Sequence, residues 1–220
     1  MSLTVVSTPI GNDKDITLRA IETLTCADII ICEEMKPART LLKGLGVDGK
    51  ELICLNEHSV AKDIPSLTEI CSEKSVALIS DCGTPGFYDP GSALVADCLF
   101  KGITVDVNPG ASSLMALIAL SGEFLTEFHF VGFLPQRKEE RAQKLRMLRD
   151  STIPLVVMDT PYRLKQTVSE LAARFPLKRA VLGIDLTGDH HQLLRAPLKQ
   201  LAEKELPKAP FVILILPQCK

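Results

Sequence analysis

Short apolar runs alternate with helix-like stretches over about the first 120 residues, and this alternation most constrains the fold of the chain. The runs expected to form strands are Leu3–Ser7, Asp28–Cys32, Glu51–Leu55, Ser75–Ser80 and Ile103–Val107. Such nearly continuous apolar runs are typical of parallel strands that are covered on both faces. Between them, Asp15 is expected to cap a helix, and Pro37 and Pro90 are expected to lie in first helical turns. Asp89 is the expected cap of the helix that Pro90 opens. The pattern predicts a doubly wound α/β domain.

The pattern changes near residue 122. Residues 127–133 alternate polar and apolar side chains, which indicates a half-exposed strand. A charged helix is expected at about 137–150, and a further helix at Tyr162–Arg174. Three more strands are expected in IPLVVMD, RAVLGIDL and PFVILIL. We therefore expect two domains, residues 1–122 with a mostly parallel sheet and residues 123–220 with a mixed α/β sheet.

Composition and charge exclude several classes of protein. The chain is 46% hydrophobic and 24% charged, which is ordinary globular usage. No apolar run approaches the roughly 18 residues that span a bilayer, and the N-terminus has no secretion-signal pattern. Seven dispersed cysteines without a C-x-x-C pair indicate free thiols, so we expect a cytoplasmic protein with no membrane partner. With a net charge of −2, an RNA partner requires a local basic patch.

Two motifs are discounted by their context. Residues 44–49 match G-x-G-x-x-G, but they follow a predicted helix and precede a strand, the reverse of the dinucleotide-binding order. They are interpreted as a helix end and a turn. His190 and His191 are adjacent, without the spacing of metal ligands or an accompanying Cys/His cluster, so no metal site is expected.

Three loops rich in glycine and proline follow predicted strands, at residues 8–12, 81–91 and 108–113. In an open α/β sheet, ligands bind beyond the carboxyl ends of the strands. Glycine there allows the backbone to approach a ligand closely. Glycine, proline and aspartate also dominate ordinary turns. Two such dense loops after successive strands favour a ligand site over two ordinary connections.

The segments STPIGNDKDITLRAIETL, ISDCGTPGFYDPGSALV and NPGASSLMALIALSG, the last followed by FVGFLPQRK, resemble the tetrapyrrole methylase superfamily. More narrowly, they resemble its ribosomal RNA small-subunit methyltransferase I branch, in order over roughly residues 4–195. The resemblance implies two α/β domains with S-adenosylmethionine in the cleft between them, S-adenosylhomocysteine as product, and a homodimer. It implies methylation of a ribose 2′-hydroxyl in the decoding region of 16S ribosomal RNA, within the small ribosomal subunit. The positions it places around the cofactor are Pro9, Asp81, Gly83, Thr84, Pro85, Asp89, Ser112 and Ser113.

The segments on the presumed substrate side depart from the family pattern. Lys36 stands where the family's E-D-T-R has arginine, which keeps the charge but loses the planar fork. Arg163 and the preceding proline are retained from Y-E-S-P-H-R, whereas the lysine of E-L-T-K is lost in the segment that begins at Asp185. Lys36 and Arg163 are candidate substrate contacts.

Three side chains are candidate general bases, and each has an ordinary explanation. Glu34 is equally well explained as an acid at a helix N-terminus, where the dipole favours it. His58 fits a solvated loop histidine, and Asp185 fits a turn cap. The sequence names no general base.

Residues 136–150 hold six Lys/Arg and three acidic residues. Arg137, Arg141 and Lys144 are spaced to share one helix face and are the expected RNA contacts. The alternative is a solvated amphipathic helix that turns Leu145 and Leu148 to the core. Two other functions stay open: methylation of a small molecule such as a tetrapyrrole, and a non-catalytic paralogue that binds the cofactor or RNA.

Overall fold

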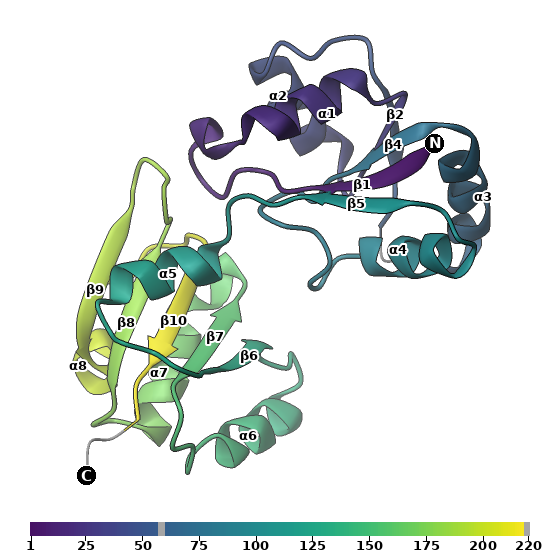
Figure 1. Ribbon diagram of the computed structural model, residues 1–220. Coiled ribbons are helices and arrows are strands. Elements are labelled where there is room, and N and C mark those ends of the chain that lie inside the picture. Colours follow the sequence, from purple (N-terminus) through teal and green to yellow (C-terminus); the bar gives the residue numbers. More distant parts are fainter. Residues whose placement is uncertain (57–59, 218–220) are drawn as a thin grey trace. The chain divides into compact units, whose positions relative to one another are not determined.

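The computed structural model describes residues 1–56 and 60–217, and the side chains of 60–62 are not described. The chain divides into two compact units, Met1–Ser112 and Ser113–Lys220 (Figure 1). The sequence analysis places the boundary at residue 122, whereas helix α5 (Ser113–Ser121) falls in the second unit because it packs on strands β8 and β10. None of the helices in the described ranges is both long and apolar enough to cross a membrane.

The first unit is built on a parallel sheet with strand order β3-β2-β4-β1-β5. Its strands are β1 (Ser2–Val6), β2 (Ile29–Cys32), β3 (Glu51–Cys54), β4 (Ser75–Leu78) and β5 (Val105–Asn108). Its helices are η1 (Asp13–Asp15), α1 (Leu18–Cys26), α2 (Met35–Gly44), α3 (Val60–Glu73) and α4 (Gly91–Phe100). All four strand pairings are parallel, which confirms the predicted sheet type.

Both faces of this sheet are buried, as the continuous apolar strands predict. Along β2, Ile30 and Cys32 pack in one hydrophobic cluster with residues of α1 and α2. Ile29 and Ile31 pack in another, with residues of α3 and α4. Figure 1 shows α1 and α2 on one side of the sheet and α3 and α4 on the other. The alternation of side chains along each strand therefore divides the core into two layers.

The helix ends follow local side-chain chemistry. The expectation that Asp15 caps α1 is wrong, because Asp15 ends η1 and the Thr17 hydroxyl accepts from the Ala20 N–H at 3.1 Å. Pro37 lies in the first turn of α2, as predicted. Gly46 has a positive φ of 69° after α2, so residues 44–49 form the helix end and turn that their context indicates.

The second unit has a mixed sheet of order β6-β7-β10-β8-β9, in which only β6 and β7 pair in parallel. Its strands are β6 (His129–Phe133), β7 (Leu155–Asp159), β8 (Arg179–Ile184), β9 (Gln192–Pro197) and β10 (Phe211–Ile215). Besides α5, its helices are α6 (Lys138–Met147), η2 (Pro161–Arg163), α7 (Leu164–Arg174) and α8 (Leu198–Ala202). The mixed sheet confirms the predicted fold class. Strand β9 is not predicted, because it is an edge strand that reads QLLRAP, with charged and proline residues.

Candidate functional site

The loops that follow β1 and β4 meet the first turns of α2 around a cavity of about 390 Å³. Three predicted site residues line it: Pro9, Asp81 and Lys36. All three belong to segments that leave the carboxyl edge of the parallel sheet, where α/β proteins bind ligands. The arrangement therefore brings together one part of the candidate cofactor site and one candidate substrate contact.

Hydrogen bonds tie the loop after β1 to the loop after β4. The Thr8 N–H donates to the Gly83 carbonyl at 2.8 Å, and the Gly83 N–H donates to the Pro9 carbonyl at 3.3 Å. The buried Thr8 hydroxyl donates to the Ser80 carbonyl at 3.2 Å. Because these bonds use backbone groups and a buried hydroxyl, the two loops hold each other in one shape.

The loop after β5 joins the same network. The hydroxyls of Ser7 and Thr84 lie 2.9 Å apart, and Thr84 also donates to the Ala111 carbonyl at 3.3 Å. A Cβ on Gly110 would lie 2.8 Å from the Cβ of Ser7, so the close approach of these loops requires glycine at 110. Thr84 thus links the loops that follow β1, β4 and β5.

Gly83 has a left-handed backbone conformation in the loop after β4. It is buried with φ at +81°, and a Cβ there would lie 3.4 Å from Ile10 Cγ2 and 3.6 Å from the Ala111 carbonyl oxygen. Side chains rarely adopt this left-handed conformation, so only glycine fits without strain. The site residue Pro85 follows two residues later, in the same loop.

Asp89 holds the end of this loop. Its carboxylate accepts from the Gly86 N–H, from the Phe87 N–H at 3.0 Å and from the Gly91 N–H at 2.9 Å. The structure has Pro90 rather than Asp89 at the N-cap position of α4, so Pro90 lies just before the first turn, and Asp89 bonds the N–H of Gly91, the first helical residue. The contacts of Asp89 therefore fix the backbone shape of this loop.

Carboxylates gather at this edge of the sheet. Asp81 accepts from the Glu34 N–H at 3.2 Å. Partial burial raises the pKa of Glu33 above its usual range, and the nearby charges of Asp81 and Asp89 raise it further. Partial burial also raises the pKa of Asp81, opposed by the hydrogen bond from Glu34 and assisted by the Glu34 charge. The smaller part of these shifts that comes from neighbouring carboxylates reflects negative charge gathered at this edge, which favours a cationic ligand.

The thiols near this edge are poor nucleophiles. Burial raises the pKa of Cys32 to about 11, with a smaller contribution from Cys54. Burial raises the pKa of Cys82, which lines the cavity, and the nearby charge of Asp81 raises it further. Both thiols are protonated at neutral pH, and the thiolate is the reactive form. The chemistry available to the cavity is therefore binding, orientation and proton transfer to carboxylates.

In the second unit, the prediction that Arg141 contacts RNA is wrong, because this side chain is buried. Its side chain is 4% exposed, and it donates to Asp159 Oδ2 at 2.7 Å and to Thr167 Oγ1 at 2.7 Å. It also pairs with Glu170. An arginine whose guanidinium is buried and shared among three side chains joins α6 to β7 and α7, and it does not reach an RNA phosphate.

The remaining α6 residues match the amphipathic alternative. Leu145 and Leu148 are buried, as that alternative expects. Arg137 is exposed but pairs with Glu140 at 3.3 Å, and Lys144 is half-buried. The predicted basic face of Arg137, Arg141 and Lys144 therefore does not exist as one exposed surface.

The other candidates are distributed over the chain. Arg163 lies in η2, with a guanidinium nitrogen 4.0 Å from Asp159 Oδ1. Asp185 has φ at +49°, and its carboxylate accepts from the His190 N–H at 2.9 Å, the geometry of a turn cap. Ser112 and Ser113 stand on either side of the boundary between the two units. His58 lies outside the described residues.

Ser7, Thr8 and Ser80 belong to the hydrogen-bonded loop network, but the sequence analysis does not single them out. Each is a buried hydroxyl residue next to the carboxyl end of an apolar strand. Their position at the end of a buried strand is the sequence signal for membership of the loop network, because a buried hydroxyl needs a hydrogen-bond partner. Among the side chains that the structure describes, no group of three or more His, Cys, Asp or Glu could hold a metal ion.

Comparison with known proteins places the chain in a family. Residues 2–202 match the family model of tetrapyrrole (corrin/porphyrin) methylases. Ribosomal RNA small subunit methyltransferase I of Thermotoga maritima is 33% identical over 217 residues, covering 97% of each chain. The protein of the same name from Leptospira biflexa is 36% identical over 185 residues, covering 84% of this chain and 77% of its own.

A solved structure shares the fold. The crystal structure of diphthine synthase superposes with a TM-score of 0.77 over 99% of this chain and 90% of its own, at 18% identity. Since that identity is low, the likeness concerns the fold alone. Taken with the family model and the more similar relatives, it shows that the chain belongs to the tetrapyrrole methylases, in the group of ribosomal RNA small subunit methyltransferase I.

Proposed function

We propose that the protein transfers a methyl group from S-adenosylmethionine to a ribose 2′-hydroxyl of 16S ribosomal RNA in the small ribosomal subunit. The observation that carries this proposal is the cavity at the carboxyl edge of the first sheet, formed by the segments in which the family motifs lie. The relatives named for methylation of small-subunit ribosomal RNA supply the substrate class.

The residues around the cavity fit this cofactor. S-adenosylmethionine carries a sulfonium and an ammonium group, and the carboxylates of Glu33, Glu34, Asp81 and Asp89 make this edge negative. The cavity of about 390 Å³ lies within the roughly 300–1,000 Å³ that is usual for small-molecule sites. When bound, the cofactor supplies the electrophilic methyl group. We propose that it is held by Pro9, Asp81, Gly83, Thr84, Pro85, Asp89, Ser112 and Ser113.

The chain's own residues would orient the reactants and accept a proton. Orientation matters because displacement at a methyl carbon requires alignment of the attacking oxygen, and positioning supplies much of the rate. A ribose hydroxyl is a poor nucleophile until a base draws off its proton. Of the two candidate bases that the structure describes, Glu34 and Asp185, Glu34 is the one whose backbone N–H donates to the cavity residue Asp81, and we propose it as the proton acceptor.

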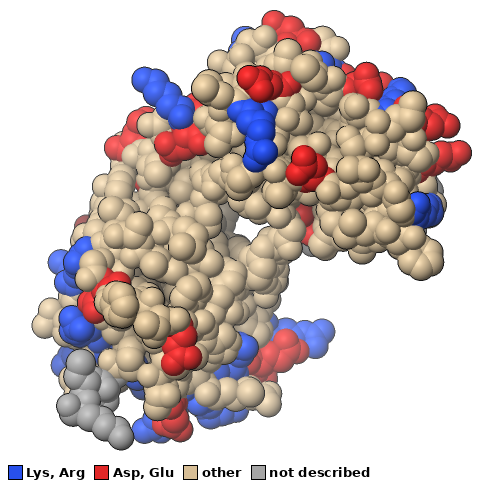
Figure 2. Space-filling model, viewed as in Figure 1, with Lys and Arg blue, Asp and Glu red and all other residues tan. Residues whose placement is uncertain are grey.

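The distribution of charge bears on how the RNA would be recognised. Figure 2 shows that basic and acidic side chains are interspersed on the face in view, rather than gathered in one broad basic surface. The net charge of −2 agrees with this. We therefore propose recognition of an assembled small subunit through its shape and a local basic patch. We further propose a homodimer in the cytoplasm; light scattering that gives the mass of one chain would overturn the dimer.

The first test is thermal unfolding with and without S-adenosylmethionine. At a hundredfold excess over its dissociation constant, a specific ligand adds about 2.7 kcal/mol to the free energy of unfolding. For a chain of this size that is roughly 5–11 °C. The second test is methyl transfer to small subunits that lack the modification, with the 2′-O-methyl group identified by resistance of the linkage to alkali. A protein that shows the thermal shift but methylates only a small molecule would overturn the substrate assignment.

A further inference from the structure

The exposed face of helix α2 is basic, and no acidic residue of the helix offsets its charge. The helix reads MKPARTLLKG, so it carries Lys36, Arg39 and Lys43 and no acidic residue. Steps of three and four residues place these three cations along one side of a helix. Ala38 and Leu42, on the other side, are buried in the core. Over the seven steps from Lys36 to Lys43, the charged side extends about 10 Å along the helix axis.

The three cations have no acidic partner within the described residues. Their side chains are exposed, and none of the ion pairs among those residues includes Lys36, Arg39 or Lys43. On α6, by contrast, Arg137 pairs with Glu140 and Arg141 is buried with Asp159. Within the described residues, α2 therefore presents three exposed cations on one side of a helix that contains no acid.

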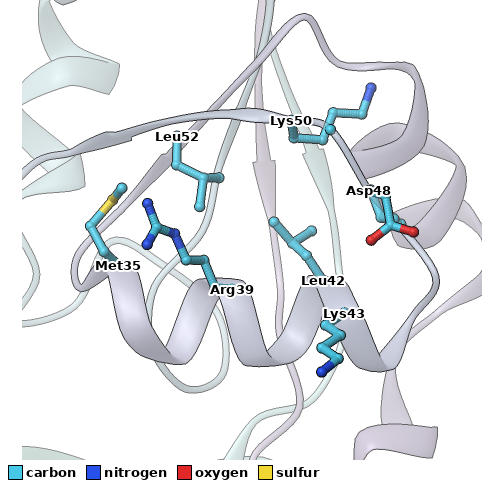
Figure 3. A pocket seen from close by; sticks show the side chains of 9 residues that line it. Met35, Arg39, Leu42, Lys43, Asp48, Lys50 and Leu52 are labelled. Atoms are coloured by element: carbon cyan, nitrogen blue, oxygen red, sulfur yellow. The ribbon is translucent and has the colours of Figure 1, made fainter.

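A second cavity, of about 230 Å³, opens between α2 and β3 (Figure 3). Its floor is apolar, because Leu42 and Val47 are 4% and 6% exposed and line it together with Met35 and Leu52. Figure 3 shows the Arg39 side chain rising from the helix between Met35 and Leu52. The Arg39 guanidinium, which has no ion-pair partner among the residues that the structure describes, therefore stands beside an apolar surface.

Lys50 and Asp48 also line this cavity, and neither pairs with Arg39. Lys50 Nζ donates to the carbonyls of Thr25 and Ala27, so this ammonium holds the end of α1. Asp48, the one acid among the described lining residues, lies at the opposite end of the cavity from Arg39 in Figure 3. Arg39 and Lys43 are thus the lining cations left for a ligand.

We infer that the basic face of α2 and the cavity beside it bind a segment of the ribosomal RNA substrate that contains an unpaired nucleotide. Arg39 and Lys43 contact its phosphates, and the base lies against the floor formed by Leu42, Val47 and Leu52. RNA recognition targets unpaired nucleotides, whose bases can pack on side chains while cations contact the backbone. Lys36 lines the first cavity, so α2 leads from the proposed methyl-transfer site to this nucleotide site. The inference rests on the proposed function.

The test compares two double variants that each remove two positive charges. Arg39→Gln/Lys43→Gln changes the proposed contacts, and Lys199→Gln/Lys204→Gln changes two exposed lysines of the second unit. For unmethylated small subunits, we expect the first variant to bind at least tenfold more weakly at low salt. The slope of log affinity against log salt should become shallower by about 1.4–1.8, because each lost phosphate contact removes roughly 0.7–0.9. KM should rise with little change in kcat, and the control should match the wild type.

The outcomes separate the two proposals. A wild-type protein without a thermal shift from S-adenosylmethionine and without methyl transfer to small subunits would overturn the proposed function. A wild-type protein that methylates them, with both double variants equal to it in affinity and salt slope, would overturn this inference alone. The thermal shift should persist in both variants, because neither changes the first cavity.

The base contact has its own measurement. A photo-crosslinking residue in place of Leu52, at the floor of the second cavity, should form a crosslink to a nucleotide that is unpaired in the small subunit. The same residue in place of Lys199 is the control and should form none. Crosslinks to paired RNA only, or none from position 52, would overturn the base contact.

Discussion

Arg141→Met is the substitution that most directly tests the structural role assigned to α6. In the folded protein the guanidinium donates to Asp159 and Thr167 at 2.7 Å each and pairs with Glu170. The side chains of Arg141 and Asp159 are 4% and 2% exposed. Methionine keeps most of the aliphatic stem but leaves the Asp159 carboxylate buried without its closest cation.

The expected loss lies at the lower end of the range for broken buried ion pairs. Removing one partner of such a pair costs about 3–5 kcal/mol, because the other charge stays buried. Asp159 would still accept from the Thr160 N–H and the Thr167 hydroxyl, both within 2.9 Å, and Arg163 lies 4.0 Å away. We therefore expect a loss of about 3 kcal/mol, which for this chain length lowers Tm by roughly 6–12 °C.

Urea unfolding measures this loss, and Arg137→Met, at the N-cap of the same helix, is the matched control. The Arg137 side chain is 82% exposed and pairs with Glu140 at the surface, so its replacement should cost about 0–1 kcal/mol. Hydrogen exchange should accelerate in β7 and α7 for Arg141→Met only. Two variants of equal stability, with the Arg141 variant impaired in RNA binding alone, would refute the burial argument and restore the original RNA assignment.

Three further predictions concern the first unit. Gly83→Val should abolish the thermal shift by S-adenosylmethionine, whereas Gly46→Ala, also at positive φ but in open space, should retain it and lose only about 1–2 kcal/mol of stability. Asp89→Ala removes the acceptor of three loop N–H groups, so we expect about 1–2 kcal/mol lower stability by urea unfolding and weaker cofactor binding by calorimetry. Because the pKa of Glu33 is raised in the folded state, that state binds its proton more tightly than the unfolded chain, and deprotonation at neutral pH is destabilising. Glu33→Gln should therefore stabilise the protein in urea at neutral pH, and the gain should vanish below the ordinary glutamate pKa; a gain that grew with acidity would contradict the assigned shift.

The layout of the first unit can be predicted because its signals are local. A strand such as IIIC in β2 is apolar on both faces, and only a sheet covered on both sides buries it. The glycine- and proline-rich loops follow directly from such strands, so their meeting at one edge follows from a parallel sheet. Which hydroxyls join those loops could not be predicted, because Ser7 and Thr84 are 77 residues apart in the chain.

The wrong prediction of an RNA-binding face on α6 also arises because the deciding contacts are distant in the chain. Helical spacing tells which of Arg137, Arg141 and Lys144 share a side of the helix, but it does not tell which side faces the core. The partners that hold Arg141 in the core, Asp159 and Glu170, lie 18 and 29 residues after it in the chain. An arginine can be buried when carboxylates and a hydroxyl satisfy its donors, so charge alone does not mark a surface residue. Lys36, Arg39 and Lys43 differ because their helix contains no acid and packs Ala38 and Leu42 on the sheet.

The charge distribution around α2 suggests how one small unit can attract two ligands of opposite charge. The carboxylates of Glu33, Glu34 and Asp81 lie at its N-terminal end, beside the cavity proposed for a cationic cofactor. Lys36 borders that cavity, and Arg39 and Lys43 continue away from it, so a phosphate bound there is separated from the carboxylates along the helix. The cations at the far end of α2 attract the RNA phosphates, whereas the carboxylates at its N-terminal end do not. This difference favours the orientation in which the RNA approaches with its ribose toward the acidic end. Reversing the charge at the far end, with Lys43→Glu, should therefore slow association with small subunits, measured by stopped flow, most strongly at low salt, while dissociation of the cofactor is unchanged. Equal association rates for Lys43→Glu and the wild type across salt concentrations would show that this end of the helix takes no part in the encounter.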